Sequence, residues 1–308
     1  MKRYLIFFRD DIIKHIGKLP LHIILHYLWL WCSSAFFVFN ANYVYEKRKH
    51  KYIIAFLDKH YGNFVPNGDL SISSEKVIQD LPIWVFWYQG ESSMPELIKL
   101  CYSSICKHSN GRKVILLTKD NLSSYLSMPS YIIDKVKNGN ISFTHLSDLV
   151  RVSLLYEYGG TWMDATLFVN GPIDNKNMNG IFGTIKIHPL SKGTISDYRW
   201  ASFYLFSQPH SQAMKCFRDV MFAFWEENNT VLDYFFIDYT FELLYQKNLS
   251  FKKIVDENSY SNQHIYSLNT YMGNDLKGIL SNEWAETFIF KLNRKNLKIL
   301  GRLRKYGN

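Results

Sequence analysis

The chain has 308 residues, of which 47% are hydrophobic and 17% are aromatic. This composition supplies a sizeable core and excludes bulk disorder, and the length allows one large domain or two small ones. The formal net charge of +9 is uneven: residues 1–60 carry ten Lys or Arg against four acids, residues 291–308 seven against none, and residues 61–290 nineteen against twenty-three. Two basic ends around a slightly acidic middle favour an anionic membrane surface as a partner. Nucleic acid is disfavoured because no basic stripe crosses the middle.

The amino-terminal region contains a long run without charge. Residues 19–45 hold no Asp, Glu, Lys or Arg and are flanked by basic residues on both sides. A helix of this length can cross a bilayer. However, its His, Ser and Asn residues make a poor hydrocarbon span, whereas its Trp and Tyr residues suit the interfacial zone. Three interpretations stay open: an in-plane interfacial helix, which is favoured, a true span, and an ordinary core helix.

The rest of the chain predicts an α/β domain behind a linker. A short helix is expected at 53–61, and the Gly, Pro and Ser residues of 62–80 predict a linker. A strand at 83–87, a helix starting near Pro95 and a strand at 113–118 imply a parallel crossover. Further strands are expected at 181–187 and 203–206, and helices at 214–226 and 233–245. We therefore divide the chain into a membrane-associating helical region (1–61), the linker (62–80) and an α/β domain with a basic tail (81–308).

The most informative segment is residues 145–169. Apolar residues recur at helical spacing from Leu146 to Leu154, and Asp148 and Arg151 project from neighbouring positions of this helix. The pair Gly159-Gly160 can stop a helix in a left-handed conformation. Residues 161–169 then read as a strand, in which alternation would put Trp162, Asp164 and Thr166 on one face. A helix with Asp and Arg, a Gly-Gly turn and a strand with Asp predict a compact polar site for a phosphorylated ligand.

These residues resemble a known family. Ser147-Asp148-Leu-Val-Arg151 and Gly159-Gly160-Thr-Trp-Met-Asp164-Ala-Thr166 are similar to the Ser-Asp-x-x-Arg and Gly-Gly-x-x-x-Asp-x-Asp signature of sugar-nucleotide glycosyltransferases. The similarity points most to the bacterial capsular polysaccharide synthesis branch, which is related to the family-32 transferases and more distantly to the clostridial glucosylating toxins. It covers roughly residues 80–295 and implies a GT-A-like α/β fold, a mixed sheet flanked by helices. One departure is that Thr166 stands at the second acidic position.

The resemblance implies roles for individual residues. Asp164 would contact the donor ribose or a metal, with Thr166 reaching that metal through water, and Asp148 and Arg151 would contact the donor sugar or phosphate. Among residues at the end of the first strand, an aromatic ring would stack on the base, and strand parity allows only one of Trp84 and Trp87 to face the site. The other candidates are Gly160 in the turn, Gln89 after the first strand, Trp200 as a sugar-stacking ring and Asp238 as the base for the acceptor hydroxyl. Weaker candidates are His145, His264, Trp284 and the basic tail from Arg294 to Lys305.

The expected function is a glycosyltransferase that moves a hexose from a nucleotide sugar, of UDP-galactose or UDP-glucose type, to a lipid-linked oligosaccharide in capsule or O-antigen synthesis. The resemblance also implies Mn²⁺ or Mg²⁺ as the cofactor, because negative charge develops on the leaving diphosphate. The expected location is the cytoplasmic face of the bacterial inner membrane, as a peripheral or single-span protein. The alternative is a non-catalytic carbohydrate- or membrane-binding scaffold derived from such an enzyme, for which Thr166 is the main support.

Overall fold

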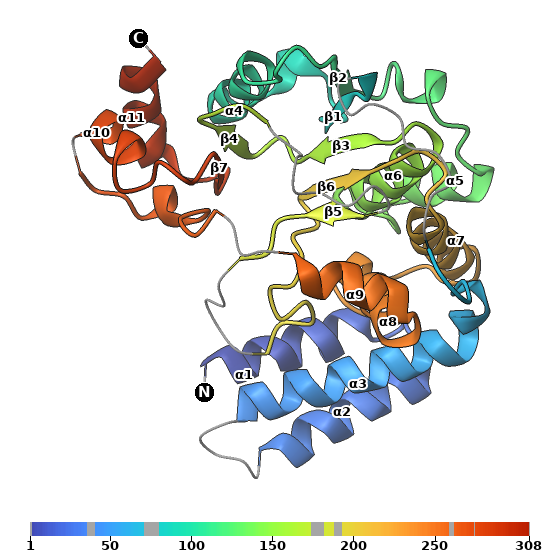
Figure 1. The fold of residues 1–308 in the computed structure, drawn as a ribbon. Helices are drawn as coiled ribbons and strands as arrows, with labels where there is room; N and C mark the ends of the chain where they lie inside the picture. The colour runs from blue at the N-terminus through green and yellow to red at the C-terminus, as the bar shows by residue number, and fades with distance from the viewer. Residues whose placement is uncertain are drawn as a thin grey trace.

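A computed structural model describes residues 2–35, 41–70, 80–173, 182–187, 193–258, 262–273 and 275–307. Within these residues, five strands form a central mixed sheet in the order β2-β1-β3-β6-β5 (Figure 1). The first three are mutually parallel: β1 (Ile83–Phe86) lies between β2 (Val114–Leu117) and β3 (Gly160–Met163). The last two run antiparallel, namely β6 (Tyr204–Ser207) beside β3, and β5 (Gly183–Thr184) beside β6.

The parallel crossover predicted from the sequence is present. Helix α4 (Glu96–Lys107) connects β1 to its parallel neighbour β2. All four residues of β1 are buried, which is typical of a strand covered on both faces. The α/β class and the order strand, helix, strand are thereby confirmed for this part of the chain.

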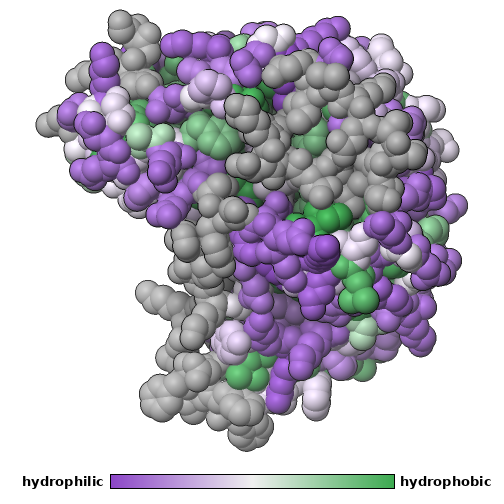
Figure 2. Space-filling model, in the orientation of Figure 1, coloured by the Kyte–Doolittle hydropathy of each residue, from purple (hydrophilic) through white to green (hydrophobic). Residues whose placement is uncertain are grey.

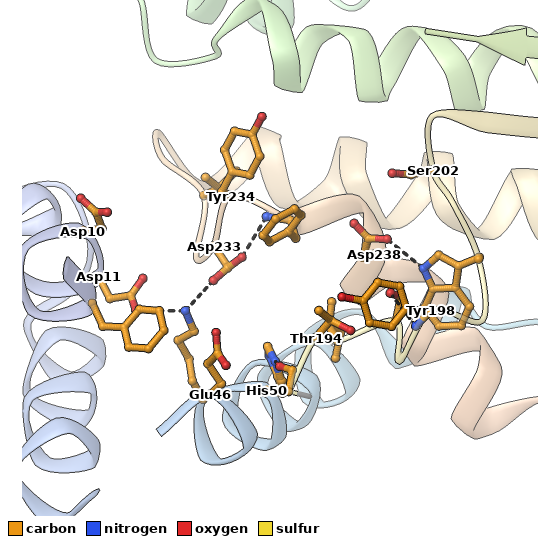
Figure 3. Close-up of a pocket in the computed structure, with 18 of the residues that line it drawn as sticks. Asp10, Asp11, Glu46, His50, Thr194, Tyr198, Ser202, Asp233, Tyr234 and Asp238 are labelled. Carbon is orange, nitrogen blue, oxygen red and sulfur yellow. Dashed lines mark hydrogen bonds and ion pairs between the residues drawn. The ribbon is translucent and has the colours of Figure 1, made fainter. Parts of the chain in front are cut away.

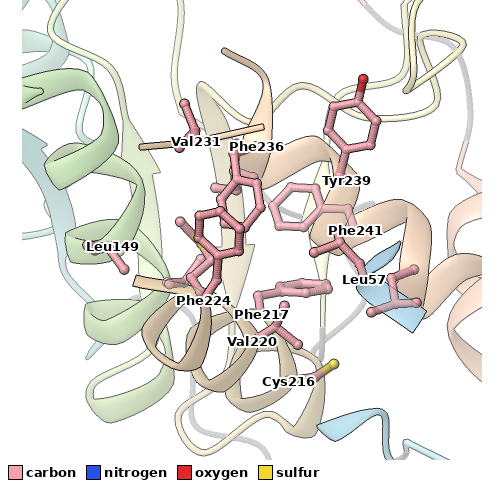
Figure 4. Close-up of a cluster of buried hydrophobic side chains, with 14 of the residues drawn as sticks. Leu57, Leu149, Cys216, Phe217, Val220, Phe224, Val231, Phe236, Tyr239 and Phe241 are labelled. Atoms are coloured by element: carbon pink, nitrogen blue, oxygen red, sulfur yellow. The ribbon is translucent and has the colours of Figure 1, made fainter. Parts of the chain in front are cut away.

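Helices on one side of the sheet build the largest core. Helix α6 (Phe143–Glu157) packs against β3 and β6, and α7 (Gln212–Glu227) packs on α6. Beyond them lie α5 (Ser130–Lys137), α8 (Phe236–Lys247) and α9 (Leu249–Glu257). Figure 4 shows the centre of this core, where Phe217 and Phe224 of α7 meet Phe236 and Phe241 of α8. Clustering of these aromatic rings fixes α8, which carries Asp238 towards the candidate site.

The amino-terminal helices join this same core. They comprise α1 (Lys2–Phe7), the π-helical η1 (Phe8–Ile12), the short 3₁₀ turn η2 (Ile13–His15), α2 (Leu21–Ser34) and α3 (Ala41–Tyr61). Helix α3 lies against α7 and α8, and its Leu57 sits in the aromatic cluster of Figure 4. On α2, Ile23, Tyr27 and Leu30 are fully buried in that core. Across the described ranges, no helix has both the length and the apolar character needed to span a membrane.

Two expectations for the amino-terminal region change. The helix expected at 53–61 is the second half of the longer α3. The predicted linker falls partly on residues 71–79, which lie outside the described residues. Its first half is packed, because the Asn248 side chain donates to the carbonyls of Pro66 and Gly68, and Leu70 is buried.

The strand expected at 161–169 is not continuous, and the prediction was wrong there. The chain turns at 164–166, where the Leu167 amide donates to the Asp164 carbonyl at 3.0 Å. Beyond the turn, β4 (Leu167–Val169) leaves the central sheet and pairs with β7 (Ile289–Lys291) in a separate antiparallel ribbon. Residues on both sides of this turn favour β structure, so the sequence pattern predicted one continuous strand. Trp162 and Thr166 therefore do not share one strand face.

The carboxyl-terminal segment continues from β7 into α11 (Leu297–Gly307), next to the short α10 (Leu276–Ser281). Both helices lie at the side of the molecule near α4 (Figure 1), where Arg304 pairs with Glu96. The face in Figure 2 is mostly hydrophilic, with hydrophobic residues in small separate patches. Residue 181 of the strand expected at 181–187 lies outside the described residues, and within 182–187 the ladder residues are Gly183 and Thr184.

Candidate functional site

The Gly-Gly turn requires glycine at both positions. Helix α6 begins at its N-cap Ser142, whose hydroxyl accepts from the His145 amide, and ends at Glu157. Gly159 has φ +67° and Gly160 has φ +102°. A Cβ on Gly160 would lie 2.3 Å from the carbonyl oxygen of Pro82. The turn therefore brings β3 directly against β1, which a larger residue would prevent.

The turn sets up one edge of the sheet as a site. Because β1 and β3 are parallel, their carboxyl ends meet at the same edge, where open α/β sheets place their ligands. Trp87 follows β1 at this edge, and Asp164 follows β3. Since β6 is antiparallel to β3, the residues before β6 start there too, and the Asp164 amide donates to the Phe203 carbonyl at 3.0 Å.

A buried ion cluster joins α6 to this edge. The Nη2 atom of Arg151 lies 3.1 Å from Oδ1 of Asp148 and 3.4 Å from Oδ1 of Asp164. Its Nη1 donates to the Ser202 carbonyl at 2.5 Å, and the guanidinium lies 5.0 Å from the centre of the Trp162 ring. Asp148 and Arg151 are only 4% and 5% exposed. The structure thus brings together the three charged residues of the motif, with Arg151 at the centre.

Lys291 completes the cluster and was not predicted as a site residue. Its Nζ lies 2.5 Å from Oδ2 of Asp164 and 4.8 Å from the centre of the Phe203 ring. The sequence interpretation counted Lys291 only as the first residue of a basic tail. No local pattern marks it, because its proximity to Asp164 arises from the pairing of β7 with β4.

The pKa values of the three carboxyl groups of the site are shifted in opposite directions. Burial raises the pKa of Asp148 to about 7, against the lowering effect of Arg151. Burial likewise raises the pKa of Asp238 to about 6, although the indole of Trp200 opposes the shift. Burial acts upward on Asp164 too, but Lys291 and Arg151 together hold its pKa below the ordinary value. Asp164 is therefore a firm anion, whereas Asp148 and Asp238 exchange protons near neutral pH, as acid–base groups do.

The residues around Asp164 do not form a ready site for a divalent cation. Its Oδ1 accepts from the Trp162 indole at 3.0 Å and its Oδ2 is paired with Lys291. The Thr166 hydroxyl oxygen is fully covered and has no hydrogen-bond partner among the described residues, so metal-held water does not reach it in this arrangement. No group of three His, Cys, Asp or Glu residues with metal-site geometry occurs within the described ranges. The Mn²⁺ or Mg²⁺ implied by the resemblance stays a prediction for an assay to decide.

The aromatic residues at the end of β1 are divided as strand parity requires. Trp84 is buried, donates its indole N–H to the Gly159 carbonyl at 2.8 Å and packs on Tyr125, so its ring has no open face for a base in this arrangement. Its role is to hold the Gly-Gly turn. Trp87 is partly exposed at the edge and donates to the Ser93 hydroxyl, and Gln89 is exposed. Trp87 is thus the one of the pair with a ring open to a ligand.

A cavity of about 700 Å³ opens beside the ion cluster (Figure 3). Ser202 and Phe203 line it and also contact Arg151 and Lys291, which links the two sites. Trp200 donates its indole N–H to Oδ1 of Asp238 at 2.8 Å, and both residues line the cavity. The remaining lining includes carboxylates, aromatic rings and basic side chains: Asp10, Asp11, Glu46, Asp233, Phe7, Tyr198, Tyr234, Tyr266, Lys14, Lys49 and His50.

The amino-terminal helices form one wall of this cavity. Lys49 of α3 lies 2.9 Å from Oδ2 of Asp11 and 2.7 Å from Oδ2 of Asp233, and all three are buried. Tyr45 donates to the same oxygen of Asp11 at 2.9 Å. Figure 3 shows Asp11 on the amino-terminal side and Asp233 on the segment before α8. Lys49 forms ion pairs with both of these carboxylates. This buried bridge binds the amino-terminal region to the catalytic body.

The weaker candidates separate into two groups. His145 lines the cavity, its Nε2 lies 3.4 Å from the Tyr234 carbonyl, and burial lowers its pKa. His264 stacks on Trp284 in the carboxyl-terminal cluster, away from the cavity lining. In the tail, Arg302 donates to the carbonyls of Met272 and Gly273, so this part of the tail is tied to its own segment.

Comparison with known proteins finds a curated relative and, among others, two loosely similar solved structures. The O-glycosyltransferase braB of Annulohypoxylon truncatum is 24% identical over 147 residues, which are 45% of this chain and 32% of that protein, so the chain covers about a third of that relative's length. Among solved structures, the PaToxG glycosyltransferase matches with a TM-score of 0.38 and 12% identity, over 66% of this chain and 79% of its own. A glycosyltransferase involved in the glycosylation of the major capsid of PBCV-1 matches with a TM-score of 0.36 and 11% identity, over 73% and 99%. At such TM-scores neither structure adds to what the topology of this chain shows.

The family comparison covers far more of the chain. The model of the capsular polysaccharide synthesis protein family matches residues 34–300. The match includes the central sheet, the ion cluster, Lys291 and Asp238, and it leaves out α1, η1, η2 and nearly all of α2. With most of its length matched, including every strand of the described residues, this chain belongs to the capsular polysaccharide synthesis protein family.

Proposed function

We propose that this protein is a glycosyltransferase that moves a hexose from a nucleotide sugar to a saccharide acceptor in capsular polysaccharide synthesis. The observation that carries the proposal is the charged edge of the sheet, where Asp148, Arg151, Asp164 and Lys291 meet beside a cavity lined by carboxylates and aromatic rings. Membership of the family and the glycosyltransferase relative support it. Carboxylates accept hydrogen bonds from sugar hydroxyls, and aromatic rings stack on sugar faces.

The donor would lie along the edge with its reacting end towards the cavity. Trp87 would stack on the base, which we expect to be uracil, and Gln89 is exposed next to it. Asp164 with its partners would face the ribose and diphosphate, while Asp148 would orient the sugar together with Arg151. Gly160 contributes by keeping β3 close to β1, as its contact with Pro82 requires. We expect UDP-galactose or UDP-glucose as the donor type.

The acceptor would occupy the cavity, with Asp238 as the base. In the transfer, the bond between the anomeric carbon and the diphosphate oxygen breaks, and its electron pair stays on the diphosphate. The acceptor hydroxyl oxygen bonds to the anomeric carbon and its proton passes to the Asp238 carboxylate. A pKa of about 6 leaves that carboxyl mostly ionised at neutral pH and able to take the proton. Trp200 fixes the carboxylate by its 2.8 Å hydrogen bond.

The acceptor we propose is a lipid-linked oligosaccharide at the cytoplasmic face of the bacterial inner membrane. The residues that support this lie in the amino-terminal region, where several large apolar side chains are exposed: Leu5, Ile13, Ile16, Leu21, Leu25 and Trp29. Lys14 and Lys18 lie in the same stretch. Exposed apolar residues with nearby lysines suit the interface of an anionic membrane. Residues of α1, η1, η2 and α3 line the cavity, so a membrane-borne acceptor would enter close to the lipid surface.

A donor screen tests the proposal. Titration calorimetry with UDP-galactose, UDP-glucose, UDP-GlcNAc and UDP-GalNAc, followed by measurement of UDP release, should identify one donor that binds and turns over. The matched control is Asp164→Ala, which should stay folded and lose turnover. Binding of saccharides without binding of any nucleotide would contradict the enzyme and favour the alternative, a non-catalytic carbohydrate-binding scaffold.

A further inference from the structure

We propose that the Lys291 ammonium, held in place by Asp164, supplies the positive charge that faces the donor diphosphate, where the motif would otherwise use a divalent cation. This inference rests on the proposed function, since it assigns a role within the same site. It makes Lys291 a ligand-contacting residue and Asp164 its positioning residue.

The two positive side chains already at Asp164 disfavour the binding of a divalent metal ion there. One carboxylate is shared by two positive groups, with Arg151 3.4 Å from Oδ1 and Lys291 2.5 Å from Oδ2. The Trp162 indole donates to Oδ1 as well, at 3.0 Å. A divalent ion bound to Asp164 would have to approach both positive groups, and Asp164 is the only carboxylate at the two acidic positions of the Asp-x-Asp motif, because the second position is Thr166. The Lys291 ammonium thus supplies the positive charge that a metal ion would supply if the motif had its second Asp.

Arg151 is not free for this task. Its Nε donates to the Ser147 carbonyl, its Nη1 to the Ser202 carbonyl, and its Nη2 to the Ser147 hydroxyl. The same Nη2 faces both motif carboxylates, and the side chain is almost fully buried. Arg151 therefore positions the carboxylates from behind, and its guanidinium does not reach a ligand without breaking these bonds.

Lys291 has the exposure and the spare hydrogen-bond donors that Arg151 lacks. Its side chain is 23% exposed and Asp164 is 24% exposed. An ammonium carries three N–H donors, and Asp164 takes one of them in the described structure. Its Nζ lies 4.8 Å from the centre of the Phe203 ring, which also lines the cavity. The ammonium is therefore located where the ion cluster meets the cavity.

The backbone on both sides of Lys291 is fixed, so the charge is pre-organised. Lys291 pairs with Leu167 in the β4–β7 ribbon, and its amide donates to the Ile265 carbonyl at 2.7 Å. The next amide, of Leu292, donates to the Thr166 carbonyl at 3.0 Å. A charge held on a rigid ribbon stabilises developing negative charge without reorganising during the reaction.

Titration calorimetry of UDP binding in excess EDTA tests the role directly, with uridine as the neutral probe. The wild-type protein should bind UDP without a metal. Lys291→Met should weaken UDP about 10- to 100-fold, the range for losing a charged hydrogen bond, and leave uridine affinity unchanged. Lys291→Arg should retain most of the UDP affinity. Lys277→Met, at an exposed lysine of α10, is the matched control and should change neither.

Two outcomes would overturn the inference while leaving the proposed function intact. One is UDP binding that disappears in EDTA and returns with Mn²⁺ in the wild-type protein. The other is equal loss of UDP and uridine affinity in Lys291→Met, which would mark a structural role. If wild-type protein binds no nucleoside diphosphate from a panel of UDP, GDP and CDP, with or without Mn²⁺, the proposed function itself fails.

Discussion

Lys49→Met tests whether the amino-terminal helices are an integral part of the catalytic body. Lys49 bridges Asp11 and Asp233 at 2.9 and 2.7 Å, and its side chain is 6% exposed. Removing its charge leaves two buried carboxylates without a positive counter-charge, and such losses cost about 3–5 kcal/mol. The variant should respond by holding one carboxyl protonated in the folded state.

The size of the loss then depends on pH in a defined way. A carboxyl that is protonated when folded and ionised when unfolded costs about 1.36 kcal/mol for each pH unit above about 3.9. The deficit in the free energy of unfolding of Lys49→Met relative to the wild-type protein should therefore grow from pH 5 to pH 7 by up to about 2.7 kcal/mol. The growth is smaller to the extent that burial already raises the pKa of Asp11 in the wild-type protein. The sign follows from proton uptake, because the folded variant binds one proton more than its unfolded state.

Urea denaturation at the two pH values measures this difference. The matched control is Lys47→Met, two residues away on α3, whose side chain is 38% exposed and pairs with Asp197 on the surface. We expect that change to cost less than about 0.5 kcal/mol at either pH. A loss below about 1 kcal/mol for Lys49→Met, or an equal loss at both pH values, would refute the buried bridge.

Three other predictions concern the site. Gly160→Ala should destabilise the fold by more than about 2 kcal/mol, since a Cβ there would lie 2.3 Å from the Pro82 carbonyl oxygen. The control Gly111→Ala also places alanine at a positive φ but in open space, and should cost about 1 kcal/mol. Equal losses for the two variants in thermal unfolding would count against the tight turn. Asp238→Asn should reduce the rate of sugar transfer about 10²-fold or more with little change in UDP affinity. The wild-type rate should drop as pH falls below about 6, because the Asp238 carboxyl then takes up a proton. A wild-type rate that is independent of pH between 5 and 8 would argue against Asp238 as the base. The raised pKa of Asp148, about 7, means that the folded state binds a proton the unfolded state lacks between about pH 4 and 7. The free energy of unfolding should therefore decline as pH rises through that window, and Asp148→Asn should make the decline shallower in denaturation experiments, a result that an unchanged slope would contradict.

The local part of the site was predictable from the sequence, and its long-range part was not. The helix with Asp148 and Arg151 and the Gly-Gly turn are short-range patterns, so helical spacing and glycine chemistry were enough. The break after Asp164 escaped because Thr166 and Leu167 suit a strand, and only the pairing of β4 with β7 takes the chain out of the sheet. Lys291 escaped for the same reason, since it lies 127 positions from its partner Asp164.

The amino-terminal region shows a different limit. An aromatic, uncharged run suits a membrane interface and a protein core alike, so its composition left the choice open. In the structure, Ile23, Tyr27 and Leu30 of this run pack in the large hydrophobic core. Lys49 looked like one of several basic residues in 47–51, and nothing near it in the sequence distinguishes a buried bridge from its exposed neighbours. Its partners Asp11 and Asp233 come from distant parts of the chain.

The measurement that tests the central claim most directly is UDP release from the preferred UDP-sugar in the presence of lipid-linked saccharides. Wild-type protein and Asp164→Ala would be compared, and circular dichroism would verify that both are folded. We predict steady release of UDP together with a sugar-extended lipid product for the wild-type protein, and loss of both for Asp164→Ala, because Lys291 is then no longer positioned. Equal turnover by folded Asp164→Ala, or no release from any donor by the wild-type protein, would contradict sugar transfer at this edge of the sheet.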